Sequence, residues 1–197
     1  FPGYTAALTG AHPLVKTDFV QKKNGLVDSD QIEFLEGPIQ PPPSHENGFY
    51  AAHVRLIFEC FERQIGTALS DTIDPLSQDF AEKVFKAPFA LLSHDNQEDP
   101  VFTYANQTAL DLFGLSFEEI TRMNSRFSAE PGLREERERL LRDVNLKGYS
   151  SGYRGIRTGK KGRFEIDQAT VWNLLSPEGR KLGQAAWFDQ WRWLKNT

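Results

Sequence analysis

Apolar and polar residues alternate through the last third of the chain, where aromatic and β-branched residues are concentrated. Three such runs cover residues 148–157, 163–175 and 182–194, and Gly-containing polar segments at 158–162 and 176–181 separate them. Runs of this kind, bounded by Gly and Pro, are typical of strands joined by tight turns. We therefore expect an antiparallel meander whose last two strands carry all four tryptophans, Trp172, Trp187, Trp191 and Trp193.

The pattern upstream has the periodicity of a helix. From residue 54 to residue 69, apolar side chains recur every three or four positions, which predicts an amphipathic helix of about four turns. Cys60 and Glu59 fall off its apolar stripe, which consists of Val54, Ile57, Phe58, Phe61, Ile65 and Leu69.

A second, shorter helix is expected to begin at Asp74 and Pro75, because an N-cap residue followed by proline favours a helix start. Pro88 is expected to end it. Its inward face consists of Leu76, Phe80 and Val84.

Two short strand candidates, 89–93 and 100–105, flank the polar segment 94–99, and this arrangement predicts a hairpin. A short helix over residues 107–113 follows and is expected to stop at Gly114, because glycine is the usual residue after a helix end.

Ser116 and Glu119 form a capping-box pattern that predicts another helical turn. A charged helix then begins at Glu130 and Pro131 and ends before Gly148. Its inward positions are Leu133, Leu140, Leu141 and Val144, and its Arg/Glu face is expected to be solvated.

This order of elements predicts an α+β fold with a five-stranded antiparallel sheet and helices on one face. Residues 1–48 differ from the rest, with a Pro-rich stretch at 37–43, and we expect an extended Pro-rich N-terminal arm there. We assign 49–74 to an N-terminal cap helix and 75–197 to the sheet domain.

Composition narrows the class of protein. The chain has 197 residues, a net charge of −4 and no dense basic cluster, which disfavours nucleic-acid binding. No apolar run approaches the roughly 18–20 residues that span a bilayer, so we expect a soluble, intracellular protein. Phe1 rather than Met is the first residue, which fits a trimmed chain or a processed precursor, and cytoplasm and plastid are equally open.

Cys60 is the single cysteine, so an intramolecular disulfide is excluded and a thiolate metal site is disfavoured. Neighbouring Glu59 and Glu62 are expected to raise its pKa and lower its reactivity. The polar turn at 94–99, with His94 and Asp95, is expected to be solvated rather than to hold a metal. We find no phosphate loop, nucleophile elbow or zinc-protease motif, and we expect no enzymatic activity.

The predicted order of elements resembles that of the PAS fold. Residues 104–114 (YANQTALDLFG) are similar to the PAS segment in which the second strand ends at an Asn, here Asn106, before a short helix and a Gly. Residues 115–120 (LSFEEI) resemble the next PAS element. The segments 162–164 (GRF) and 171–175 (VWNLL) resemble its fourth strand.

A closer resemblance is to the MEKHLA domain, a PAS-related family, over about residues 45–194. It rests on 128–137 (SAEPGLREER), 170–175 (TVWNLL), 183–188 (GQAAWF) and the helix around His53. The chain has no homeodomain or zipper heptad and so resembles the stand-alone members. The resemblance implies a sensory module, and it suggests a photosynthetic setting such as the chloroplast.

Residues 124–127 (NSRF) resemble the segment of blue-light PAS domains, the LOV subclass, in which a Cys bonds flavin and the Arg meets its phosphate. Ser125 occupies the Cys position, and a hydroxyl does not form that adduct. Non-covalent flavin or another small ligand remains an open alternative. In the other interpretation, Asn124 and Ser125 cap a helical turn and Arg126 pairs with a carboxylate.

Strict alternation along the strands predicts which side chains share a face. On the fourth strand Phe164, Ile166, Trp172 and Leu174 would lie together, with Gln168 and Thr170 between them. On the last strand Ala185 and Trp187 would lie with Asp189, Trp191 and Trp193, and Gln184, Ala186, Phe188 and Gln190 opposite.

An apolar pocket with a few inward amides would suit a small molecule. The candidate ligand-binding residues are Asn106, Arg126, Phe127, Gln168, Thr170, Trp172, Gln184 and Trp187. In the alternative, the aromatic side chains are ordinary core and the polar ones face solvent.

Trp191 and Trp193 are expected to lie on the outer sheet face, covered by the N-terminal segment or by a homodimer or regulatory protein partner. We therefore expect a non-enzymatic sensory module that binds a small apolar or amphipathic ligand between sheet and helices and signals through a partner. The alternative is a ligand-free protein–protein interaction domain.

Overall fold

The computed structural model describes residues 20–22, 25–27 and 41–195. The chain divides into two units, 1–31 and 32–197. In the first, strands β1 (Val20–Lys22) and β2 (Gly25–Val27) pair antiparallel. Most of the expected N-terminal arm lies outside the described residues.

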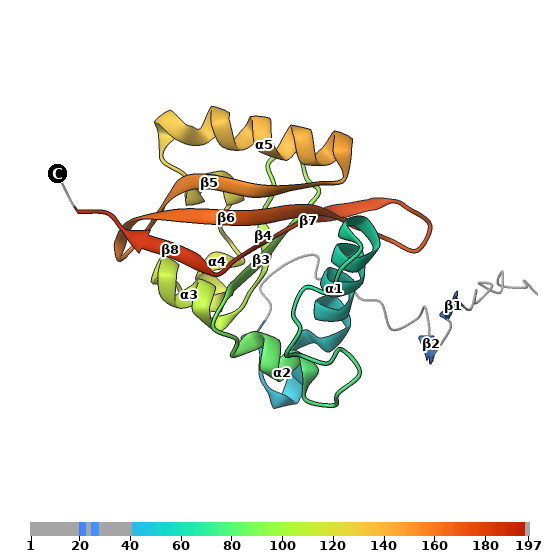
Figure 1. Ribbon diagram of the computed structural model, residues 1–197. Helices are drawn as coiled ribbons and strands as arrows, with labels where there is room; N and C mark the ends of the chain where they lie inside the picture. Colours follow the sequence, from blue (N-terminus) through green and yellow to red (C-terminus); the bar gives the residue numbers. More distant parts are fainter. Residues whose placement is uncertain (1–19, 23–24, 28–40, 196–197) are drawn as a thin grey trace, which may run out of the picture. The chain divides into compact units, whose positions relative to one another are not determined.

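A mixed α+β fold with an antiparallel sheet forms the second unit, as predicted. Within residues 41–195 the sheet has six strands in the order β4-β3-β7-β6-β5, with β8 also paired to β6 (Figure 1). The strands are β3 (Ala90–Asp95), β4 (Phe102–Ala105), β5 (Tyr149–Gly159), β6 (Gly162–Leu175), β7 (Lys181–Phe188) and β8 (Gln190–Trp193). The sixth strand continues the fifth predicted one beyond Asp189.

Helices cover both faces of this sheet. Helix α1 (Ala51–Ile65) contacts β6 from one side and α5 (Arg134–Lys147) contacts β5 and β6 from the other (Figure 1). Neighbouring residues on β6 show this directly, because Trp172 packs on Phe61 of α1 whereas the Asn173 amide donates to Val144 O of α5 at 2.9 Å. The sheet is therefore buried on both sides in its centre.

Several helix boundaries lie where the local sequence signals predicted them. Helix α3 (Gln107–Phe113) has the predicted bounds and ends at Gly114, whose φ of +65° favours glycine. Helix α4 (Phe117–Ile120) begins with the predicted capping box of Ser116 and Glu119. Two 3₁₀ turns, η3 (Ser125–Ser128) and η4 (Pro131–Leu133), precede α5, which therefore begins after the predicted Glu130.

The first helix differs from the prediction in its length and its inward face. It follows the 3₁₀ segment η2 (His45–Tyr50) and ends at Gly66, so Leu69 lies in the next loop. Cys60, expected off the apolar stripe, is buried, and its Sγ lies 3.3 Å from Leu175 N and 3.4 Å from Leu175 O. Burial, more than Glu59, raises the pKa of this thiol.

The second helix begins later than predicted. Asp74 and Pro75 form a turn in which Asp74 Oδ1 accepts from Leu76 N at 2.9 Å, and Leu76 is 78% exposed rather than inward. Helix α2 (Phe80–Phe85) starts five residues after Pro75, with Phe80 and Val84 buried as expected.

A β-bulge at Gln168 overturns the predicted faces of β6. Gln168 has a φ of +53°, and the register with β5 shifts around it. An extra residue in a strand reverses the alternation beyond it. As a result Phe164 packs on Phe113 of α3 on the α5 side of the sheet, whereas Trp172 packs on α1.

Opposite the bulge of β6, the neighbouring strand is interrupted at Asp189, which separates β7 from β8. Trp193 packs edge-on against Phe164 and Trp191 against Phe188, at centroid distances of 5.4 Å and 6.3 Å. Both tryptophans therefore lie on the face of Phe188, not with Ala185 and Trp187, and they do not form the expected outer patch.

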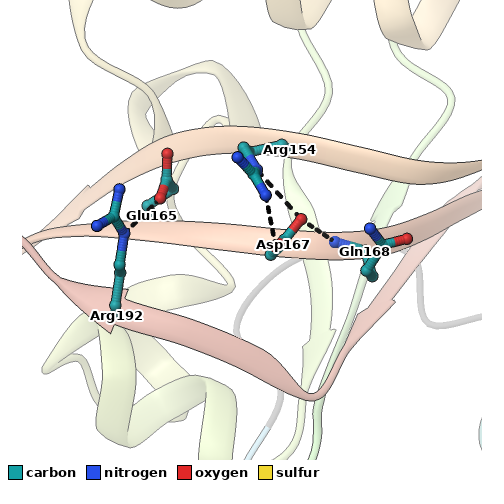
Figure 2. A network of polar contacts seen from close by, with 5 residues as sticks. All are labelled: Arg154, Glu165, Asp167, Gln168 and Arg192. Atoms are coloured by element: carbon teal, nitrogen blue, oxygen red, sulfur yellow. Dashed lines mark hydrogen bonds and ion pairs between the residues drawn. The ribbon is translucent and has the colours of Figure 1, made fainter.

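Charged side chains lie near β8 on the sheet face opposite the cavity side of Ile166, which we call the outer face (Figure 2). Asp167 accepts from both Arg154 Nη2 at 2.8 Å and Gln168 N at 2.9 Å, and Arg192 Nε donates to Glu165 at 2.6 Å (Figure 2). The Asp167 carboxylate thus stabilises the backbone of the bulge. We name Arg154, Glu165, Asp167 and Arg192 the charged ladder.

The left-handed backbone of Gln168 predicts that Gln168→Gly raises the free energy of unfolding by about 1 kcal/mol, because glycine carries no Cβ penalty there. Gln190→Gly is the matched control in an ordinary strand position and should lower it by about 0.5–1 kcal/mol. Urea unfolding measures both. If both variants are equally destabilised, Gln168 is not held in the left-handed region.

Candidate ligand-binding cavity

A cavity of about 60 Å³ lies between the sheet and helices α3 and α5. Its walls come from five strands, so the side chains meet only when the whole sheet is formed. Apolar groups dominate the lining, which includes Leu92, Phe102, Phe113, Leu140, Leu141, Ile166, Ala169, Val171, Ala186 and Phe188, with His94, Ser128, Arg137, Tyr153, Arg157 and Gln184 as polar members.

His94 presents an unpartnered acceptor. Its Nδ1 lies 2.7 Å from Asp95 O, and because a carbonyl only accepts, Nδ1 carries the proton and Nε2 a lone pair. Nε2 is buried and has no hydrogen-bond partner in the described part of the chain. Burial, assisted by the nearby charge of Arg137, lowers the pKa of His94 to about 4, so the imidazole is neutral at pH 7.

Arg137 projects from α5 into the same cavity and is only 6% exposed. Its Nη2 donates to Ser125 Oγ at 2.6 Å. Burial and the neighbouring charge of Arg157 lower its pKa to about 10, which leaves it charged at pH 7. Among residues 41–195 no carboxylate lies within the 4.0 Å of an ion pair with it.

Arg157 of β5 is the second cation in the lining. Its guanidinium lies 5.3 Å from the centre of the Tyr153 ring, a cation–π contact, and Nη1 donates to Ile156 O at 2.9 Å. Neither contact neutralises its charge.

Gln184 joins the sheet to α5. Its Nε2 donates to Leu141 O at 3.1 Å and to Asn173 Oδ1 at 3.0 Å, and the Asn173 amide in turn donates to Val144 O. We call Gln184 and Asn173 the amide clamp. Of the eight residues predicted to bind ligand, Gln184 is the one that lines the cavity.

Asn106 lies outside the lining and is wholly engaged within the protein. Its Oδ1 accepts from Leu91 N and Ala109 N, and its Nδ2 donates to Val84 O and Phe89 O. The side chain therefore caps α3 and joins it to α2 and β3. No donor or acceptor of its amide is left for a ligand.

Arg126 and Phe127 lie at the surface. Arg126 Nε is 3.1 Å from Asp99 Oδ1, as the carboxylate-pairing interpretation predicted, and its guanidinium lies over the Phe127 ring, which is 42% exposed. Asn124 precedes η3 without a side-chain cap, contrary to the expected role, and donates to Asp99 O instead.

The other predicted residues also lie away from the cavity, and for those of β6 the bulge is the cause. Trp172 is fully buried under α1, where its Nε1 donates to Ile57 O at 3.2 Å, and Thr170 donates to Ser151. Trp187 packs against Phe89, and Gln168 is exposed.

The sequence did not identify the histidine and the two arginines of the lining, His94, Arg137 and Arg157. Arg137 had a detectable signal, since it lies three, four and seven residues before Leu140, Leu141 and Val144, on their stripe. His94, expected in a solvated turn, is instead buried in β3. Arg157 lies in β5 beyond its register shifts, and no local pattern identifies it.

The lining does not fit a flavin. A cavity of about 60 Å³ is far below the roughly 300–1,000 Å³ of cofactor pockets. Ser125, at the position of the reactive Cys, is buried against Arg137, and Arg126, the expected phosphate ligand, is paired at the surface.

In the described ranges, no group of three or more His, Cys, Asp or Glu side chains could hold a metal ion. None of the described helices combines the length and apolarity needed to cross a membrane.

The chain is similar to known proteins in its sequence family and in its fold. The family model of the MEKHLA domain matches residues 51–193. A search of curated proteins found no match. Similar solved structures include the PAS domain of a protein from Colwellia psychrerythraea, with 17% identity, TM-score 0.49 and coverage of 58% of this chain and 92% of that one.

Two further solved structures are light-oxygen-voltage proteins. One, a domain studied with a flavin analogue, has 19% identity and TM-score 0.47, with 58% and 84% of the two chains covered. The other, an RNA-binding receptor, has 18% identity and TM-score 0.48, and the match covers 62% of this chain but only 35% of the receptor.

The sheet order β4-β3-β7-β6-β5, with helices packed over the cavity, defines a PAS-like α+β domain. Because the family model covers most of the chain, the protein belongs to the MEKHLA domain family, as the sequence motifs indicated. Domains of this PAS-like class are generally sensory modules rather than enzymes.

Asn106→Asp should lower the free energy of unfolding by about 3 kcal/mol or more, because a carboxylate would face Val84 O and Phe89 O without a donor. The exposed Asn96→Asp is the matched control and should change it by less than about 0.5 kcal/mol. Urea unfolding at pH 7 compares them. Equal stabilities would show that the Asn106 bonds do not hold the fold.

Stability should fall as the pH drops from about 6.5 toward 4. Burial lowers the pKa of His53 to about 3 and of His94 to about 4, so the unfolded chain binds protons in this window that the folded chain does not. Each histidine should contribute about 2 kcal/mol of lost stability between pH 7 and pH 5.

The variant His94→Gln measures how much of this pH-dependent loss of stability comes from the cavity histidine. The loss of stability between pH 7 and pH 5 should shrink by about 2 kcal/mol in this variant. It should be unchanged in the control His45→Gln, whose side chain is 81% exposed in the native protein. An undiminished loss in His94→Gln would mean that His94 is already protonated in the fold.

Proposed function

We propose that this MEKHLA protein is a sensory module whose cavity between the sheet and α5 binds a small molecule. The carrying observation is the unpartnered Nε2 of His94 in a largely apolar enclosure. A buried acceptor without a partner costs free energy, and a donor supplied by the occupant, or by a water that enters with it, removes that cost.

Helix α5 is the element through which occupancy would be transmitted. Leu140 and Leu141 form part of the cavity wall, while the amide clamp holds the same helix to β6 and β7. An occupant that fits one position of α5 better than another shifts the helix toward that position. The output would pass to a regulatory protein partner or to a second copy of the chain.

The outer sheet face offers a different contact surface from the one expected. Helix α1 covers its centre, and the charged ladder forms the accessible end. A partner that docks there would be complementary in charge rather than apolar.

The second candidate is a protein–protein interaction domain without a ligand. The size of the cavity favours it, since about 60 Å³ accommodates only a few non-hydrogen atoms. The two functions differ in whether an occupant of this cavity exists.

A ligand-detected NMR screen of small organic molecules would test the proposed function on the full chain. We expect binders whose signals are lost with Ala186→Val, which fills the cavity without removing a polar group. Ala52→Val, on α1, is the control and should bind as the native protein does. If Ala186→Val keeps every binder, the cavity is not the site.

A further inference from the structure

We propose that the occupant of this cavity is a small organic anion, a short-chain carboxylate held by Arg137 and Arg157. The inference rests on the proposed function, because it names the chemistry of the ligand for the same cavity. Its evidence is separate, since it comes from the charges of the lining and not from the unpartnered acceptor of His94.

Arg137 is a buried cation without a counter-ion among the described residues. Removing a guanidinium from water is costly unless an opposite charge is close. In the structure its Nη2 meets only the neutral hydroxyl of Ser125, at 2.6 Å. A carboxylate beside Arg137 would supply the missing charge through short, charge-assisted hydrogen bonds.

The acidic side chains near Arg137 are engaged by other arginines. Asp99 lies 3.1 Å from Arg126, and Glu138 is 3.9 Å from Arg142. Both influence Arg137 only at longer range. These two carboxylates are therefore paired elsewhere, which leaves this guanidinium to an external anion.

Arg157 strengthens the preference for an anion. It lines the same cavity, lacks an ion pair among the described residues and is close enough to depress the pKa of Arg137. Two like charges at one cavity repel each other, and a single carboxylate between them would turn that repulsion into attraction.

The rest of the lining limits the body of the ligand. Leu92, Val171 and Phe188 provide apolar walls, and the volume of about 60 Å³ leaves room for a few carbon atoms. A carboxylate on a short apolar chain matches both features, whereas a dicarboxylate or a nucleotide would exceed the space or leave a charge against apolar walls.

Propionate and its neutral isostere propionamide test the charge directly on the full chain. Titration followed by two-dimensional NMR should show propionate binding at least tenfold more tightly than propionamide. Arg137→Gln should abolish this preference and leave the melting temperature without ligand unchanged or higher, because an uncompensated buried charge is removed.

Arg139→Gln is the matched control, since it makes the same change at an exposed position of α5. It should keep the preference for propionate. Arg157→Gln, a second variant in a different element, should also weaken propionate binding and keeps the proposal testable if Arg137→Gln fails to fold.

Three results would overturn the assignment. The assignment of an anion fails, and the cavity function stands, if propionamide binds as tightly as propionate or if both arginine variants retain the preference. The same holds if neither probe binds while the small-molecule screen finds a cavity binder. If neither probe binds and the small-molecule screen also finds no cavity binder, the proposed function itself fails.

Discussion

The interruption of the sheet at Gln168 and Asp189 determines what each face of this molecule does. Before the break on β6, Phe164 and Ile166 point to the α5 side, and after it Trp172 points to α1. One strand, β6, therefore contributes both to the wall of the cavity and to the packing of α1 on the sheet. Without the bulge, the Trp172 indole would lie in the cavity and α1 would lose its principal contact.

Stability and function compete in the cavity. The four bonds of Asn106 satisfy its amide completely, and together with the amide clamp they hold the helices in place. Arg137 and His94 are unlike them. Within the part of the chain that the structure describes, Arg137 has no counter-ion and His94 Nε2 has no donor, and both features lower the stability of the fold. Groups kept at such a cost are concentrated at functional sites, and here both belong to one enclosure.

Elements encoded by local signals could be predicted from the sequence, whereas long-range placement could not. The α3 stop at Gly114 and the α4 capping box depend on neighbours within five residues, and both predictions were right. The face of Trp172 was wrong because alternation was assumed to continue through Gln168. Asn106 was correctly placed after a strand, but its bonds to Val84 O and Phe89 O join segments about 20 residues apart, which no spacing rule reveals. Arg137 lies on the apolar stripe of its helix, but its charge favoured the prediction that it belongs to the solvated Arg/Glu face.

Methyl-resolved NMR of the full chain with and without millimolar propionate tests the central claim, that the α5 side of the sheet is the binding face. We expect shifts for the methyl groups of Leu92, Ile166 and Val171, which line the cavity. The methyl groups of Val54, Ile57 and Leu174, which lie in the core away from the cavity lining, should not move. Shifts confined to this second set would contradict it, and no shift in either set at saturating propionate would contradict the assignment of an anion.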